Sequence, residues 1–161
     1  MRLDEGGGGP AVVFTDGACL GNPGPGGWAW AISPEEYESG AEHHTTNQRM
    51  EVTAVLRALS ATPGRVRIVS DSTYVVNCFR QRWWEGWRKR GWRNAKGDPV
   101  ANQDLWRPLI DEVIDRRSGE VEMTWVKGHS GDPMNDLVDR LAGEAARRQG
   151  PLDLESDWVG Q

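Results

Sequence analysis

The chain has 161 residues, of which 37% are hydrophobic and 27% charged, the balance of an ordinary globular domain with its own core. No apolar run is long enough for a membrane span or a signal peptide, and two cysteines, Cys19 and Cys78, are too few for a disulfide framework. The net charge of −5 argues only weakly against a polyanionic partner. We expect a cytoplasmic protein without membrane contact, and a monomer.

The N-terminal part of the chain predicts a strand that leads to an acid. Residues 1–10, rich in glycine, are expected to form a flexible leader. The apolar run 11–14 is typical of a buried central strand, and Asp16 follows at its end, before a turn dense in Gly and Pro. Two further strands, 28–32 and 36–41, are close enough to form a hairpin.

A helix is predicted from Thr46 or Asn47, either of which is a good N-cap, to about Ala61, where Pro63-Gly64 ends it. Its apolar residues recur with helical spacing and form one face. Glu51 shares that face, so its carboxylate is expected to point inward.

A fourth strand, 65–70, also ends at an acid, Asp71, which with Ser72 caps a short helix through Phe79. The later elements are a core helix over 103–117, an alternating strand over 121–125, a loop over 128–133, and a helix from Asn135 to Arg148 that contains Asp139.

This order of elements predicts an α/β fold with a five-stranded mixed sheet, in the order 3-2-1-4-5, flanked by helices. The first and fourth strands would be parallel neighbours, with Asp16 and Asp71 together in the crevice at their carboxyl ends. We expect residues 11–149 to form one domain, followed by a C-terminal tail at 150–161.

Each prominent acid has an ordinary structural explanation: Asp71 as a helix cap, Glu51 as a first-turn acid, and Asp139 as a surface residue. Brought together with Asp16, however, they would repel one another unless cations held them. Oxygen ligands select Mg²⁺ or Mn²⁺, and a pair of such ions is the usual device for cleaving a phosphodiester. His129, on a glycine-flanked loop, could assist proton transfer.

The segment 80–96, called the basic handle below, carries a charge of +6, which leaves −11 on the remainder of the chain. This asymmetry fits a nucleic-acid-binding patch on an acidic body. A solvated helix face explains the charge alone equally well.

The motifs together resemble one family. The segments are TDGACLGNPGPGGW, TTNQRMEVTAVLRAL, VSDSTYV, WWEGWRKRGW, WVKGHSGDPMND and DRLA. Over 12–147 the chain is similar to ribonuclease H of type 1, the bacterial kind with a basic handle. The resemblance implies the ribonuclease H-like fold and an endonuclease that hydrolyses the RNA strand of RNA–DNA hybrids. It also implies two Mg²⁺ ions, or Mn²⁺, per active site with substrate, and products ending in 5′-phosphate and 3′-hydroxyl.

The resemblance also implies roles for individual residues. The family's metal ligands fall on Asp16, Glu51, Asp71 and Asp139, and its mobile histidine falls on His129, so that these five form the catalytic set. The RNA-strand contacts are Cys19, Asn22, Asn47 and Gln48. The DNA-strand contacts are Tyr74 and Trp83, with Thr46 and Asn102 as a phosphate pocket. The basic handle presents Trp84, Trp87, Arg88, Lys89, Arg90 and Trp92.

Two alternative functions stay open at this point. A non-catalytic module could bind hybrids through the basic handle, although the acid set has no gap. A DNA-cleaving relative with the same sheet, such as a resolvase or transposase nuclease, would use the same acids on a different substrate.

Overall fold

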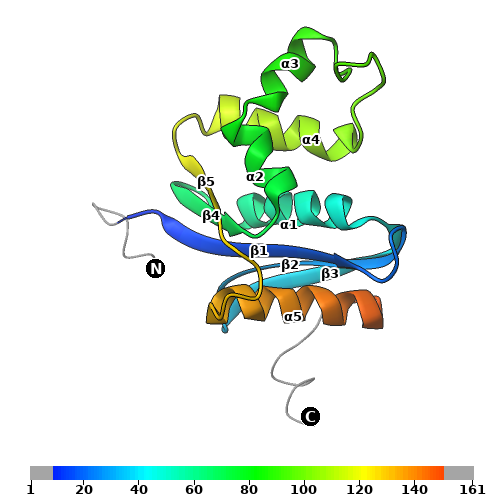
Figure 1. Cartoon of the computed structure of the whole chain (residues 1–161). Helices are drawn as coiled ribbons and strands as arrows, with labels where there is room; N and C mark the ends of the chain where they lie inside the picture. The colour runs from blue at the N-terminus through cyan, green and yellow to red at the C-terminus, as the bar shows by residue number, and fades with distance from the viewer. Residues whose placement is uncertain (1–8, 151–161) are drawn as a thin grey trace.

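A five-stranded sheet lies at the centre of the molecule in the computed structural model, which describes residues 9–150 (Figure 1). Its strands are β1 (Ala11–Cys19), β2 (Gly24–Ser33), β3 (Glu36–Thr45), β4 (Val66–Ser70) and β5 (Val121–Trp125). They lie in the order β3-β2-β1-β4-β5, with β1, β2 and β3 antiparallel and β4 and β5 parallel to β1. The predicted α/β fold and strand order are confirmed.

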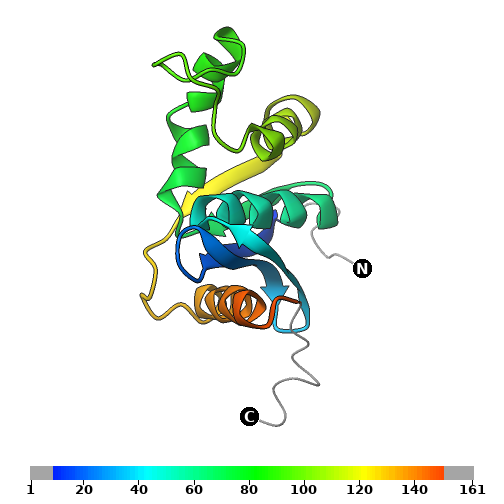
Figure 2. The same ribbon diagram turned by 90° about the vertical axis from the view of Figure 1, so that its right-hand side faces the viewer.

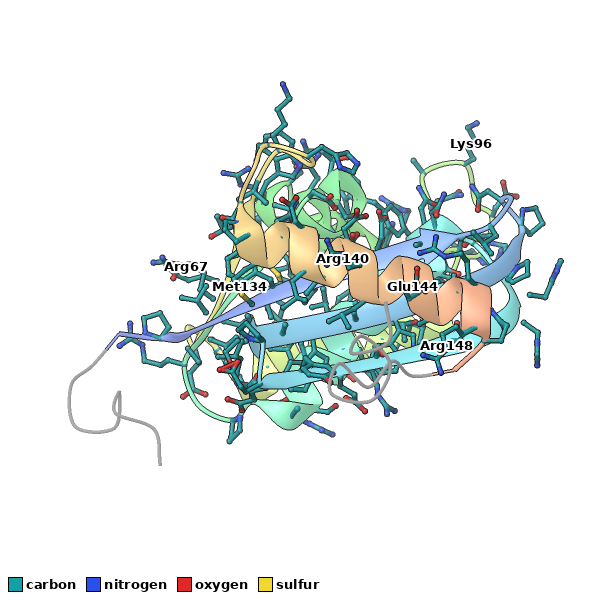
Figure 3. All side chains as sticks on the ribbon, turned by 90° about the horizontal axis from the view of Figure 1, so that it is seen from below. Arg67, Lys96, Met134, Arg140, Glu144 and Arg148 are labelled. Atoms are coloured by element: carbon teal, nitrogen blue, oxygen red, sulfur yellow. The ribbon has the colours of Figure 1, made fainter. Side chains whose placement is uncertain are left out.

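Helices cover both faces of this sheet. They are α1 (Asn47–Ala61), α2 (Thr73–Arg80), α3 (Trp83–Lys89), α4 (Gln103–Ile110), a π-helical turn η1 (Asp111–Arg116) and α5 (Pro133–Arg148). Figure 2 shows α1 and α5 on opposite faces, with α2, α3 and α4 on the α1 side. Seen from below, α5 runs across β1, β2 and β3 (Figure 3).

Two apolar cores hold these layers together. The larger one joins α1 to the sheet and to α4, and its fully buried side chains include Met50, Ile68 and Trp106. The smaller one lies under α5 and contains Val138 and Leu141. Because the apolar face of α1 packs into the larger core, Glu51 is drawn inward with that face, as the sequence predicts.

The first strand is longer than predicted, and Asp16 lies within it rather than at its end. The parallel pairing of β1 with β4 stops at Thr15 and Ser70, whereas the antiparallel pairing with β2 continues to Cys19. Asp16 therefore lies one residue beyond the parallel part of the sheet. The sequence predicted a turn here because residues 24–27 are rich in Gly and Pro, which usually indicate turns. In the structure these residues instead form the start of β2.

Two helix predictions also need correction. The single helix predicted over 103–117 is α4 followed by the π-helical η1, and Pro108, which has no N–H to donate, lies just before the change. The last helix begins at Pro133 rather than Asn135, because the side chain of Asp132 caps it. Asp139 is consequently in the second turn of α5.

The predicted leader (1–10) and tail (150–161) lie outside the described residues, apart from residues 9, 10 and 150. No helix within 9–150 combines the length and apolarity that crossing a membrane requires.

Candidate active site

The structure brings together four acids from four elements: Asp16 from β1, Glu51 from α1, Asp71 directly after β4, and Asp139 from α5. The charges of Asp71 and Asp139 both raise the pKa of Asp16, and the charge of Asp71 raises the pKa of Glu51. Asp16, Asp71 and Asp139 therefore lie close enough to interact electrostatically, and Glu51 interacts with Asp71; these four residues are called the acid cluster below.

Two glycines let the main chain approach these acids closely. A side chain at Gly17 would overlap the main-chain nitrogen of Glu51, so only glycine allows β1 to lie directly against the start of α1. A Cβ at Gly128 would lie 2.9 Å from Oδ2 of Asp71, which shows that the loop before α5 packs on that carboxylate.

Burial and like charge act in the same direction on these acids. Asp16 is only 6% exposed, and burial, followed by the charges of Asp71 and Asp139, raises its pKa well above the usual value. Burial also raises the pKa of Asp71 and raises that of Glu51 to about 7. The structure thus holds these carboxylates where being charged is costly.

Ser72 is a contributor that the sequence suggested only as a helix cap. Its hydroxyl donates to Oε1 of Glu51 at 2.8 Å and accepts the main-chain N–H of Val75 at the start of α2. The hydrogen bond to Glu51 favours the charged carboxylate and lowers its pKa. No sequence pattern reveals this contact, because the two residues are 21 positions apart.

The donor set suits a hard divalent cation. Within residues 9–150, no three or more His, Cys, Asp or Glu side chains already surround one point as metal ligands. The carboxylates instead act on one another through their charges, and those of Asp71 and Asp139 raise the pKa of Asp16. Asp16 is buried, Glu51 and Asp71 are partly buried and Asp139 is exposed, so the oxygen donors lie between the core and the solvent. Mutually repelling oxygen donors are nevertheless the chemistry that Mg²⁺ or Mn²⁺ would stabilise. The residues therefore fit such ions, after the side chains have reoriented.

His129 lies on the loop between β5 and α5, with a left-handed backbone (φ 56°). Its charge lowers the pKa of Asp71, so the imidazole is within electrostatic reach of the acid cluster. The predicted catalytic histidine and the acids are thus near neighbours.

The four residues predicted to contact RNA gather around the β1–β2 turn and the start of α1. The Sγ of Cys19 donates to the carbonyl oxygens of Gly24 and Thr45, each at 3.3 Å. Oδ1 of Asn22 accepts the main-chain N–H of Asn47 at 3.0 Å. These contacts join the turn to the helix start, where Gln48 is exposed.

The residues predicted to contact DNA lie at the junction of α1, α2 and α4. The side chain of Thr46 caps α1 by accepting the N–H of Arg49. The hydroxyl of Tyr74 accepts bonds from Asn102 at 3.4 Å and from Trp106 at 2.8 Å, and its ring centroid lies 6.3 Å from that of Trp83.

The basic handle contains α3 and the loop that follows it. Some of its cations are paired with acids of the body, and others are exposed to solvent. Trp84 is buried beneath the guanidinium groups of Arg82 and Arg88, and Trp87 packs edge-on against Trp106 of the core. Arg88 forms ion pairs with Asp111 at 2.9 Å and Asp115 at 2.8 Å. These contacts anchor the handle to the body.

The other predicted handle residues lie nearer the solvent. Lys89 and Arg90 are exposed, and Nε of Arg90 donates to the carbonyl oxygen of Arg93 at 3.0 Å. Trp92 lies under the guanidinium of Arg107, 4.8 Å from the ring centroid. Lys89 and Arg90 therefore present the accessible charge of the set.

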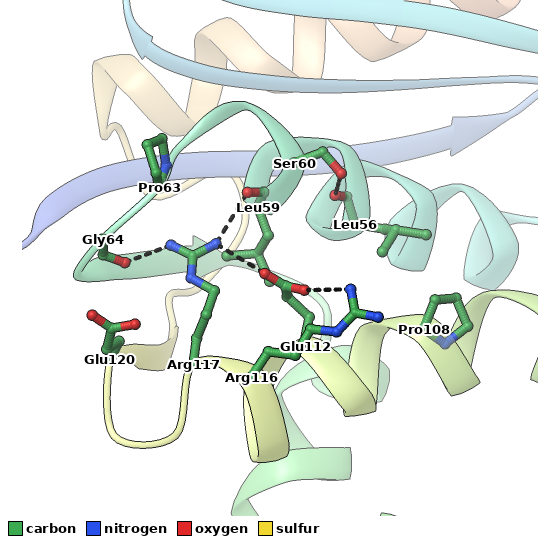
Figure 4. A pocket seen from close by; sticks show the side chains of 10 residues that line it. All are labelled: Leu56, Leu59, Ser60, Pro63, Gly64, Pro108, Glu112, Arg116, Arg117 and Glu120. Atoms are coloured by element: carbon green, nitrogen blue, oxygen red, sulfur yellow. Dashed lines mark hydrogen bonds and ion pairs between the residues drawn. The ribbon is translucent and has the colours of Figure 1, made fainter.

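A cavity of about 570 Å³ opens near the C-terminal end of α1, away from the acid cluster (Figure 4). Arg117, a buried residue of its lining, donates to the carbonyl oxygens of Leu59, Thr62 and Gly64. Arg117 therefore binds one carbonyl in the last turn of α1 and two in the segment that follows, and none of the four acids lines this cavity.

A mixed sheet in this order, with acids gathered beyond its parallel part, fits the ribonuclease H-like class of proteins. The family model described as RNase H matches residues 9–147. The chain belongs to the ribonuclease H family, and it is an enzyme.

Named relatives agree with this assignment. The chain is 46% identical over 145 residues to a ribonuclease H of Syntrophomonas wolfei, covering 86% of this chain and 97% of that protein. It is 49% identical over 143 residues to one of Thermus thermophilus, covering 86% and 84%. Among solved structures it resembles LC9-RNase H1, described as a type 1 RNase H with the type 2 active-site motif. That match has a TM-score of 0.70 and 30% identity, and it covers 93% of this chain and 80% of the other.

Proposed function

We propose that this chain is an endonuclease that hydrolyses the RNA strand of RNA–DNA hybrids, leaving 5′-phosphate and 3′-hydroxyl ends. The observation that carries the proposal is the cluster of four carboxylates on a ribonuclease H sheet, with a basic, aromatic handle on the same molecule. Membership of a family whose named relatives are ribonucleases H supports the choice of substrate.

Asp16, Glu51, Asp71 and Asp139 would hold two Mg²⁺ ions, or Mn²⁺. When bound, such a pair supplies an activated water and neutralises the charge that develops on the leaving oxygen. By holding these ions, the carboxylates would set the position of the scissile phosphate. Ser72 holds the Glu51 side chain by its hydroxyl, and burial around Asp16 limits water at the cluster.

His129 is assigned to proton transfer, because an imidazole can both give and accept a proton and this one lies near Asp71. Its loop begins at the end of β5 and packs on Asp71 through Gly128, which would place the imidazole within reach of a phosphate bound at the acids.

Substrate recognition divides between two surfaces. The turn after β1 and the start of α1 offer Cys19, Asn22, Asn47 and Gln48 to the sugars of the RNA strand, whose 2′-hydroxyls distinguish it from DNA. Tyr74, Trp83 and the pocket of Thr46 and Asn102 receive the DNA strand, with the basic handle beyond them.

We assign residues 11–149 to the ribonuclease H domain and propose that it acts as a cytoplasmic monomer. The thiols of Cys19 and Cys78 are both free, which fits a reducing compartment.

The test is cleavage of an end-labelled hybrid, compared with duplex RNA and duplex DNA, with and without Mg²⁺ or Mn²⁺. We expect metal-dependent cleavage of the RNA strand of the hybrid alone, with 5′-phosphate ends. Asp71→Asn should lower the rate by about a thousandfold. Asp136→Asn, which removes an exposed acid from the first turn of α5, is the matched control.

Other outcomes point to the alternatives. Tight hybrid binding without turnover in either metal would indicate a non-catalytic binding module. Cleavage of duplex DNA would indicate a DNA nuclease with the same sheet. Equal activity of the wild type and Asp71→Asn would contradict the assignment of the acids.

A further inference from the structure

Arg49 ties three elements together at one edge of the molecule. It lies in the first turn of α1, and its NH1 and NH2 donate to the two carboxylate oxygens of Asp104 in α4, at 3.0 and 2.7 Å. Its Nε donates to Glu42 of β3 at 3.4 Å. Every nitrogen of the guanidinium therefore has a carboxylate partner.

The paired helices begin at the two residues predicted to share a DNA phosphate. Thr46, the N-cap of α1, is three residues before Arg49, and Asn102, the N-cap of α4, is two residues before Asp104. The forked ion pair therefore spans the gap between the two helix starts, one turn below the capping residues.

Other contacts fix only one side of α4. Trp106 is fully buried and bonded to Tyr74, which attaches the middle of the helix to the core. Asn102 has a left-handed backbone (φ 59°) and makes no side-chain cap, and its side chain donates to the hydroxyl of Tyr74 at 3.4 Å. This bond ties the start of α4 to α2 and not to α1. Asp104 supplies a rigid attachment at that end.

Global stability does not explain the arrangement. The side chain of Arg49 is 28% exposed and that of Asp104 is 62% exposed, and ion pairs at such sites contribute little to folding. Attraction for the substrate does not explain this set of ion pairs either. Arg49, Glu42 and Asp104 together carry a net negative charge, and they lie beside a surface proposed to bind a polyanion.

We propose that Arg49 and Asp104 are positioning residues that set the spacing between Thr46 and Asn102, and with it the fit of the DNA-strand phosphate. This inference rests on the proposed function. Without the fork, the start of α4 moves away from α1 and the pocket widens. The acid cluster, held by the sheet and by Ser72, keeps its geometry.

The decisive variant is Asp104→Asn, because two explanations predict opposite signs for it. Removing a negative charge near a polyanion should tighten binding by electrostatics alone. Losing the spacing should weaken it, and we expect KM for the hybrid to rise about fivefold, with kcat at saturating hybrid unchanged. Asp104→Glu, which keeps a carboxylate, should restore much of the loss.

Glu122→Gln is the matched control. Glu122 is a 58% exposed acid paired with Arg67 at 3.2 Å, on the edge strand β5. This variant also removes one negative charge and one surface ion pair, so KM should stay level or fall. Thermal unfolding of all variants verifies that each is folded.

Hybrid binding is measured in parallel by fluorescence anisotropy in EDTA, where no cleavage occurs. A wild type that binds hybrids without cleaving them refutes the proposed function, and the ratio of dissociation constants still tests the positioning role. A KM and dissociation constant for Asp104→Asn at or below those of the wild type overturn the inference. So does a wild type that binds no hybrid.

Discussion

The acid cluster and the basic handle both concentrate charge of one sign. They differ in whether residues of opposite charge lie beside it. In the handle, Arg88 pairs with Asp111 and Asp115, and Arg82 pairs with Glu85 while lying over the ring of Trp84. In the cluster, the charges that act on Asp16 are those of two other acids.

This difference distinguishes charges that stabilise the fold from charges that are available to bind a ligand. A charge that the chain itself compensates holds elements together, as Arg88 holds α3 to η1. A buried charge whose neighbours repel it weakens the fold, and it is useful where a cation arrives from outside. We therefore propose that the acid cluster is the site of catalysis and that the paired residues of the handle serve to hold the handle on the body.

The largest expected effect comes from Asp16→Asn, which should change activity and stability in opposite directions. The amide cannot replace a carboxylate ligand, so hybrid cleavage should fall by about a thousandfold. In metal-free buffer the same change removes a buried charge that Asp71 and Asp139 repel, so the melting temperature should rise by roughly 2–4 °C for each kcal/mol relieved.

Cleavage kinetics and calorimetry in EDTA measure the two effects on one preparation. Asp136→Asn is again the control: it should leave cleavage unchanged and should not raise the melting temperature, because it removes an acid that favours the start of α5. A melting temperature that falls with Asp16→Asn would show that this carboxylate is structurally compensated, and the contrast with the handle would not hold.

The second prediction concerns pH. Burial raises the pKa of Glu51 from 4.5 to about 7, so the folded state binds this proton more tightly than the unfolded state. Its contribution is fully present below about pH 4.5 and is lost as the pH rises through about 7. In EDTA the free energy of unfolding should therefore fall by on the order of 2 kcal/mol across this range.

Urea unfolding at intervals of pH measures that fall, with Glu51→Gln as the test variant and Glu122→Gln as the control. The slope should be shallower in Glu51→Gln and unchanged in Glu122→Gln. Identical slopes in the wild type and Glu51→Gln would mean that the carboxylate is not destabilised in the folded protein.

Much of the fold follows from local pattern. The inward face of α1, the strand order 3-2-1-4-5 and a helix start at Thr46 or Asn47 were all predictable, because periodicity, capping and crossover handedness act over short segments, and the structure selects Thr46 as the N-cap. The position of Asp16 within β1 was not, because a Gly- and Pro-rich segment is read as a turn until its partner strand is known.

Contacts between distant residues were beyond sequence reasoning. The bond from Ser72 to Glu51 and the fork from Arg49 to Asp104 join residues 21 and 55 positions apart, and neither pair has a distinctive spacing. The same holds for the handle, where composition gave its charge but not which cations are paired. Arg88 and Lys89 are adjacent in the chain, yet only a folded structure shows Asp115 beside Arg88.

The third prediction, for which we expect the smallest change in hybrid binding, compares the adjacent residues Arg88 and Lys89. Lys89→Gln and Arg88→Gln each remove one positive charge from α3. Because Lys89 is exposed, its loss should reduce the slope of log affinity for the hybrid against log salt by about one. Because Arg88 is already paired, its loss should leave that slope unchanged and lower the free energy of unfolding by about 1 kcal/mol.

Anisotropy titrations over a series of salt concentrations measure the slopes, and urea unfolding measures the stabilities. Each variant serves as the control for the other, since the two differ only in whether the lost cation had partners. If Arg88→Gln reduced the slope as Lys89→Gln does, Arg88 would leave Asp111 and Asp115 to bind phosphate. The handle would then resemble the acid cluster in holding charge for an outside partner.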